Sequence, residues 1–280
     1  MNIPLLFSQP LGLLLIRAWV KAFGTLRAKE RYDVLRRQPY AYGLFRATEV
    51  AKFFGKSQVT VCEFGIAAGD GLLNMAALCN LISEETKIGF RIVGFDTGEG
   101  LPEIEGYKDH PEIWSAGDFT MPSRDELVKK MDGRAEIIFG DIKDTVKPFL
   151  NDLNQNAPLG FIAVDVDTYS GAKSVLRCLT GPPELYNPAV SIYCDDISFF
   201  FANDWCGELA AVREFNAENA MRKIDRDRSL PGTRPVRSRG WHQHMFICHI
   251  LDHQARNVTP RKGKLTIEEH NIYMQNSFIY

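Results

Sequence analysis

The chain has 280 residues, of which 45% are hydrophobic, and its formal net charge is −2. This length and composition suffice for one large globular domain with appendages, while the near-neutral charge gives no basic field of the kind that nucleic-acid binding requires. Six cysteines are scattered along the chain, and no two form a Cys-x-x-Cys pair. The sequence therefore indicates neither a zinc site nor a disulfide framework, and a reducing cytoplasm is the simplest location.

The N-terminal segment is apolar but short. Residues Ile3–Ile16 are mostly apolar, although Ser8, Gln9 and Pro10 interrupt the run and Arg17 ends it. The run falls short of the about 20 residues that a membrane-spanning helix needs, and its positive charges follow it, unlike those of a secretory signal. We expect a helix that packs on the domain or on a partner, a second copy of the chain included. The alternative is a helix in the plane of a membrane surface.

The patterning divides the chain into three parts. Residues 1–57 are predicted to form a charged helical extension, residues 58–252 the main domain and residues 253–280 a C-terminal tail. The predicted strands of the main domain are Val59–Phe64, Phe90–Phe95, Ala135–Phe139, Phe161–Val164, Val190–Cys194 and His244–Leu251. The helices predicted between them are Leu72–Leu81, Asp125–Met131, Thr145–Leu153 and Ser170–Leu179. This alternation indicates a Rossmann-like α/β fold, with a mostly parallel sheet covered by helices on both faces.

Ligands bind such a sheet at the carboxyl ends of its strands, so the residues that follow each strand are the candidates. After the first strand the chain runs Glu63-Phe64-Gly65-Ile66-Ala67-Ala68-Gly69-Asp70-Gly71. Small residues let the backbone approach a ligand closely, but Ala67 and Asp70 stand where a dinucleotide fingerprint has glycine. An acidic residue two positions before Gly65 suits a cofactor with a free ammonium group. A tight turn without a ligand is the alternative.

Single carboxylates follow the second and third strands. Asp96 can accept hydrogen bonds from both ribose hydroxyls of an adenosine, and the alternative is a cap for a helix or turn. Asp141 can accept from an adenine amino group or can cap the helix that follows it. The pattern leaves both alternatives open.

Four carboxylates follow the fourth and fifth strands, which are expected to be neighbours: Asp165, Asp167, Asp195 and Asp196. Without compensation they would repel one another. A hard divalent cation such as Mg²⁺ relieves that repulsion, and it can bind a substrate hydroxyl and lower its pKa. The alternative is that arginines or water compensate the charge.

Three other features have weaker implications. His242 and His244 would share one face of a strand, but no cysteine or carboxylate completes a metal site, so a surface or core role is expected. The arginines within residues 225–241 favour a solvated loop, with contact to an acidic substrate or partner as the alternative. The aromatic residues Phe199–Phe201 and Trp205 either line an acceptor pocket or belong to the core.

The ordered set of segments resembles the class I S-adenosylmethionine-dependent methyltransferases, and most closely the macrocin O-methyltransferase-like family. Five segments that together span about half the chain carry the resemblance: Val61–Leu73, Gly94–Pro102, Gly140–Thr145, Val164–Tyr169 and Tyr193–Ile197. It implies a cofactor site for S-adenosylmethionine formed by Glu63, Gly65, Ala67, Gly69, Asp96 and Asp141. Within that site Asp96 is implied to hold the ribose, and Asp141 to lie beside the adenine.

The resemblance also implies a metal triad of Asp165, Asp195 and Asp196, with Asp165 or Asp167 as the catalytic base. The implied reaction is methyl transfer to a hydroxyl of a small molecule or sugar, with Mg²⁺ on the acceptor and with residues 97–122 closing over it. Three alternatives stay open: a metal-independent methyltransferase acting on nitrogen or carbon, an enzyme that uses NAD or a nucleotide sugar, and a non-catalytic interaction module.

Overall fold

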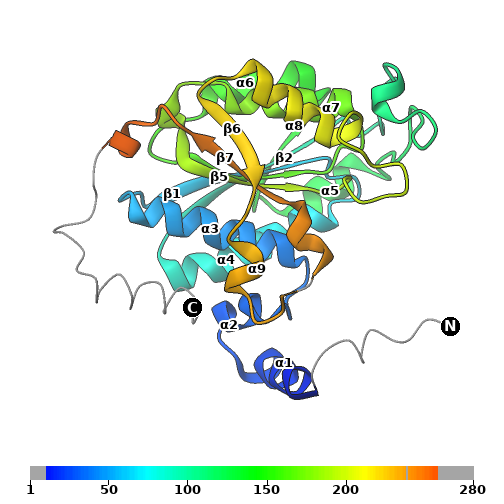
Figure 1. Ribbon diagram of the computed structural model, residues 1–280. Coiled ribbons are helices and arrows are strands. Elements are labelled where there is room, and N and C mark those ends of the chain that lie inside the picture. Colours follow the sequence, from blue (N-terminus) through cyan, green and yellow to red (C-terminus); the bar gives the residue numbers. More distant parts are fainter. Residues whose placement is uncertain (1–10, 238, 258–280) are drawn as a thin grey trace.

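The computed structural model of the chain describes residues 11–237 and 239–257 (Figure 1). Its strands are β1 (Gln58–Phe64), β2 (Gly89–Asp96), β3 (Glu136–Phe139), β4 (Leu159–Val164), β5 (Tyr186–Cys194), β6 (Arg222–Arg226) and β7 (Met245–Ile250). They form one sheet in the order β3-β2-β1-β4-β5-β7-β6. Strands β1 to β5 pair in parallel, whereas β7 is antiparallel to both of its neighbours. The prediction of a mostly parallel sheet is confirmed.

Helices cover both faces of this sheet. They are α1 (Leu11–Phe23), α2 (Leu26–Arg31), α3 (Gln38–Phe53), α4 (Asp70–Thr86), α5 (Arg124–Met131), α6 (Ile142–Asp152), α7 (Tyr169–Leu176), α8 (Gly207–Glu218) and α9 (Leu230–Thr233). In Figure 1, α6, α7 and α8 lie over one face and α3 and α4 over the other. The protein therefore has a Rossmann-like α/β fold that is preceded by a helical extension.

Each face of the sheet buries its own apolar cluster. Under α6 the ring of Phe64 stacks on Phe95 at 4.4 Å, and Phe149 meets Phe95 edge-on at 5.1 Å. On the other face α3 lies so close to β4 that a Cβ at Gly43 would stand 2.3 Å from the Phe161 ring. All six residues of β4 are buried, which explains its unbroken apolar sequence. The two clusters hold the strands, and hence their carboxyl ends, in fixed positions.

The strand order reverses beside β1. From β1 the chain proceeds outward to β2 and β3, and it then returns to the other side of β1 to form β4 and β5. In open α/β sheets a crevice opens at the carboxyl ends of the strands on either side of such a reversal. The fold thus places the loops after β1 and β4 at the edge where ligand binding is expected.

The prediction that the arginines within residues 225–241 lie in a solvated loop is wrong for Arg234, which is buried. Its guanidinium pairs with Glu30 of α2 and lies 2.8 Å from Asp33 Oδ1, and Arg239 Nε lies 3.1 Å from the other oxygen of Asp33. A buried arginine requires such partners, and these stand about 200 positions earlier in the chain. The segment therefore fastens the N-terminal extension to the main domain.

Three elements of the main domain, β6, α8 and α9, were not predicted. Four of the five residues of β6 are charged, as suits an edge strand, so no apolar run marks it.

His242 and His244 lie in a 3-10 helix, Gly240–His244, ahead of β7. They therefore do not share a strand face.

The apolar N-terminal segment is described only from Leu11 onward, because residues 1–10 lie outside the described residues, as do 258–280 of the predicted tail. Within the described ranges, no helix is long and apolar enough to cross a membrane. Self-association and membrane-surface contact through this segment stay predictions.

Candidate functional site

The loop after β1 touches the loop after β4. Gly65 has a φ of +85°, and a Cβ there would stand 1.7 Å from the main-chain oxygen of Asp165. Gly69 caps α4, also at φ +85°, and a Cβ there would stand 2.1 Å from the Leu127 side chain. Gly65 requires glycine, because its left-handed conformation and the nearby main-chain oxygen exclude a side chain, whereas at Gly69 the left-handed conformation favours glycine and the Leu127 side chain could move. The glycine-containing turn after β1 therefore packs directly against the main chain that follows β4.

Asp96, at the end of β2, accepts hydrogen bonds from the loop after β1 and from the loop after β2. Its Oδ2 accepts hydrogen bonds from the backbone N–H groups of Ile66 and Ala67 at 2.9 and 2.8 Å, and its Oδ1 accepts from Gly98 at 2.6 Å. A carboxylate has about four lone-pair positions. Three are used here, so about one remains for a ligand hydroxyl. This differs from the expectation that Asp96 accepts from both ribose hydroxyls.

Asp141 caps the helix that follows it, and its contact with an adenine stays a prediction. As the N-cap of α6 its Oδ1 accepts from the backbone N–H of Lys143 at 2.9 Å, and its Oδ2 lies 2.9 Å from the Lys143 ammonium. The residue also lines the cavity described below. Its carboxylate is therefore held in place by the helix that it caps while it faces the ligand space.

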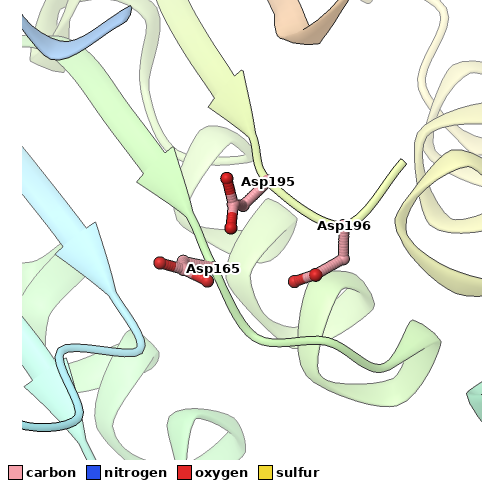
Figure 2. Close-up of side chains that lie close together, drawn as sticks. All are labelled: Asp165, Asp195 and Asp196. Carbon is pink, nitrogen blue, oxygen red and sulfur yellow. The ribbon is translucent and has the colours of Figure 1, made fainter. Parts of the chain in front are cut away.

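Asp165, Asp195 and Asp196 come together at the ends of β4 and β5 (Figure 2). The two strands are paired so that Val164 stands opposite Cys194, and the residues that follow therefore meet. One carboxylate oxygen from each of the three lies within 4.8 Å of the others. Burial, and then the charges of the neighbouring aspartates, raise the pKa of Asp165 and that of Asp196 to about 8. Burial and mutual repulsion thus disfavour the charged forms of Asp165 and Asp196.

Asp167 stands beside this cluster without belonging to it. Its backbone, at φ +61°, donates a hydrogen bond to Asp196 Oδ2 at 3.2 Å, and its side chain lines the cavity. Burial and the nearby Asp165 raise its pKa to about 7. Asp167 therefore faces the same space as the cluster, with a carboxylate that is not among the three converging oxygens.

Glu208 is a buried acid that the sequence analysis missed. Its Oε2 accepts from the backbone N–H of Asp196 at 3.3 Å, and its Oε1 has no hydrogen-bond partner among the described residues. Burial and the charge of Asp196 raise its pKa well above the usual value. No signal marked it, because α8 was not predicted. Glu208 thus adds a buried carboxyl with an unsatisfied oxygen beside the three clustered aspartates.

Glu63 lies beneath the loop and does not line the cavity. It is buried, its Oε1 accepts from the Tyr40 hydroxyl at 2.6 Å, and its Oε2 has no partner among the described residues. Arg37, at the start of α3, has a left-handed φ of 46° and places its guanidinium carbon 5.3 Å from the Tyr40 ring. Burial alone would lower the pKa of Arg37, but Tyr40, Glu63 and Asp165 raise it. The N-terminal helices thus supply a cation and a phenol to the underside of the site.

One cavity of about 310 Å³ joins these parts. Its polar lining comes from Asp96, Asp141 and the aspartates after β4 and β5, and its apolar lining includes Leu101, Pro102, Trp114 and Phe119 from the segment between β2 and α5. Phe199 packs edge-on against Trp114, at 6.0 Å, but Phe200 is 91% exposed. Of the aromatic run after β5, neither Phe200 nor Phe201 belongs to the core or to this lining. The volume lies within the range of small-molecule sites.

The three clustered carboxylates fit a divalent cation. Carboxylate oxygens are the donors that Mg²⁺ prefers, and a set of three leaves coordination positions for water or a substrate oxygen. Burial and mutual repulsion raise the pKa of Asp165 and that of Asp196, and a cation would favour their charged forms. The donor set is therefore compatible with the metal that the sequence predicted.

No protein-family model and no curated protein matches the chain. Among solved structures it is similar to CalS11, a calicheamicin methyltransferase, with 21% identity and a TM-score of 0.47 over 76% of this chain and 85% of that one. It is also similar to the O-methyltransferase NovP, with 16% identity and a TM-score of 0.47 over 67% and 75% of the two chains. A third similar structure is the O-methyltransferase TomG from Streptomyces achromogenes, in complex with SAM, with 12% identity and a TM-score of 0.44 over 85% and 94%. At such low similarity, the function has to be inferred from the site itself.

Proposed function

We propose that the protein transfers a methyl group from S-adenosylmethionine to a hydroxyl of a small molecule or sugar, with help from a divalent metal. The observation that carries this proposal is the cavity of about 310 Å³, which joins the loops after β1, β2 and β3 to the acidic cluster after β4 and β5. A cofactor held by the first set of loops would reach an acceptor held by the second. Alignment of two reactants in one cavity is the main contribution that a protein makes to such a transfer.

The charge of the cavity favours this cofactor over a dinucleotide. The carboxylates of Asp96, Asp141 and Asp165 line the space, and they would repel a pyrophosphate while attracting a sulfonium or ammonium group. The apolar walls from Leu101 and Trp114 suit an adenine ring. The remaining acceptor position on Asp96 would take one ribose hydroxyl.

The acidic cluster supports the choice of an oxygen acceptor. Asp165, Asp195 and Asp196 would hold the metal, which when bound lowers the pKa of a coordinated hydroxyl. Asp167, which lies outside this set of three and lines the cavity, would accept the hydroxyl proton. Bound S-adenosylmethionine would supply the activated methyl group, whose transfer to the acceptor oxygen would break the carbon–sulfur bond and release neutral S-adenosylhomocysteine. The proton on Asp167 passes to solvent.

Calorimetric titration with S-adenosylhomocysteine tests the cofactor, with NAD as the control ligand. We expect S-adenosylhomocysteine to bind and NAD not to bind. Failure of the folded protein to bind S-adenosylhomocysteine would overturn the proposal. Binding of NAD instead would favour an oxidoreductase or nucleotide-sugar enzyme on the same sheet.

Electron paramagnetic resonance of Mn²⁺ tests the metal without a known acceptor. We expect Mn²⁺ to bind the wild type, and the variants Asp195→Asn and Asp196→Asn to bind it at least about tenfold more weakly. Asp204→Asn, in an exposed position eight residues further on, is the matched control and should bind normally. Wild-type binding of S-adenosylhomocysteine without any effect of these substitutions on Mn²⁺ would favour a metal-independent methyltransferase.

A further inference from the structure

Helix α1 carries a continuous apolar face that the described residues do not cover. We define the apolar face of α1 as Leu11, Leu15, Ile16, Trp19 and Phe23, whose exposed fractions are 75%, 66%, 47%, 61% and 76%. At about 100° per residue these five side chains occupy an arc of about 140° on the helix. The arc contains no charged residue, because Arg17 and Lys21 project from the rest of the circumference. Contiguous exposed apolar surface of this kind usually marks an interaction site.

The orientation of α1 is fixed by contacts on its opposite side. Val20 is buried, and the Arg17 guanidinium donates hydrogen bonds to the main-chain oxygens of Tyr32 and Asp33 at 2.9 and 2.8 Å. These bonds fasten α1 to the end of α2. In Figure 1, α1 lies at the periphery of the molecule, on the far side of α2 from the sheet. These contacts fix the orientation of α1, and its apolar face therefore points away from the rest of the described structure.

The surface around this face is basic. Between residues 11 and 37 the only acidic residues are Glu30 and Asp33, and both are engaged by the buried Arg234. Lys21 is exposed, and Lys29 is half-buried. Residues 1–10 add no acidic side chain. The exposed charge beside the apolar face is thus positive, without an exposed acid of the same segment to balance it.

We propose that α1 docks in the plane of an anionic lipid surface, with its apolar face among the acyl chains and its basic residues at the headgroups. Apolar and aromatic residues on one side of a helix and cations on the other are the features of interfacial helices, and anionic lipids attract each nearby lysine or arginine. A second copy fits less well, since a two-fold contact through the apolar face would leave the exposed cations beside it without an opposite charge. The assignment does not depend on the proposed methyl transfer.

Flotation of the full-length protein with lipid vesicles tests this assignment. One set is phosphatidylcholine alone, and in the other roughly a third of the lipid is phosphatidylglycerol. We expect binding to the anionic set only, weakened by salt. Trp19→Ser should weaken it about tenfold, by loss of an apolar anchor, and Lys21→Glu roughly tenfold, by reversal of a charge. Neither residue packs in the core, so thermal unfolding should be unchanged.

Two matched controls separate the site from general surface effects. Phe53→Ser removes an aromatic side chain that is 63% exposed at the end of α3, and Lys129→Glu reverses an exposed charge on α5; neither should alter binding. Equal binding of Trp19→Ser and wild type would overturn the proposal, as would failure to bind anionic vesicles. A dimer in light scattering that Trp19→Ser dissociates, without vesicle binding, would assign the apolar face to a second copy instead.

Discussion

Replacing Glu63 by Gln should flatten the pH dependence of the free energy of unfolding. Burial raises the pKa of Glu63 from 4.5 to about 8, even though the hydrogen bond from Tyr40 lowers it. The folded protein therefore holds a proton on Glu63 that the unfolded chain releases near pH 4.5. This group contributes stability that is fully present below pH 4.5 and is lost as pH rises to about 8.

The magnitude follows from the size of the shift. Each pKa unit corresponds to about 1.4 kcal/mol, so a shift from 4.5 to about 8 corresponds to about 4 to 5 kcal/mol between acidic and alkaline solution. The side chain is fully buried, so solvent does not screen this difference. Gln has the same shape and can accept from Tyr40, but it does not ionise. Its unpaired amide lowers stability by an amount that is the same at every pH.

Urea unfolding of the ligand-free protein at pH 5 and pH 9 measures the effect. The neighbouring buried acids add pH dependence of the same sign, so the test is the difference between wild type and Glu63→Gln at each pH. We expect Glu63→Gln to gain about 4 kcal/mol relative to wild type between the two values. Tyr40→Phe, which removes the donor to the ionised form, should steepen the wild-type dependence. Parallel curves for wild type and Glu63→Gln would refute the buried ionisation.

Two further substitutions test the packing of the site and of the extension. Gly65→Ala should lower the free energy of unfolding by more than about 2 kcal/mol, because of left-handed strain and overlap with a main-chain oxygen. In the control Gly240→Ala the new Cβ meets nothing within 4 Å, so the free energy of unfolding should change by less than about 1 kcal/mol. Equal melting temperatures of the two variants would contradict the close approach at Gly65. Arg234→Met should lower the free energy of unfolding by about 3 to 5 kcal/mol, because Glu30 is left buried without its partner. In the control Arg228→Met the lost ion pair has an arginine side chain that is 83% exposed, so the free energy of unfolding should change by less than about 1 kcal/mol.

The parallel part of the sheet could be predicted because its central strands are mostly buried and largely apolar, β4 above all, although the edge strand β3 is only partly buried. A carboxylate ends β2, and others follow β3, β4 and β5 within two residues. That is why Asp96, Asp141 and the aspartates after β4 and β5 could be singled out, and why the structure brings them to one edge. The limits of each helix were less predictable: α4 begins at Asp70 and ends at Thr86, well beyond Leu72–Leu81.

Sequence reasoning missed the contacts between polar groups that are distant in the chain. Tyr40 meets Glu63 across 23 positions, Tyr42 donates to Asp227 across 185 and Arg234 reaches Glu30 across 204. Hydrophobic periodicity indicates only whether a position faces a core, and motif spacing relates only residues that are close in the sequence. Such pairings follow from tertiary packing and carry no local signature.

These long-range contacts make the N-terminal helices part of the cavity's support. α3 buries Tyr40 against Glu63, directly beneath the loop after β1, and α2 holds Arg234 in a buried ion pair. Buried polar contacts therefore cross residue 57, where composition alone suggested a boundary. A buried carboxyl or guanidinium loses several kcal/mol of stabilisation when its partner is removed. The geometry of the loop after β1 consequently depends on helices that contribute no residue to the lining of the cavity.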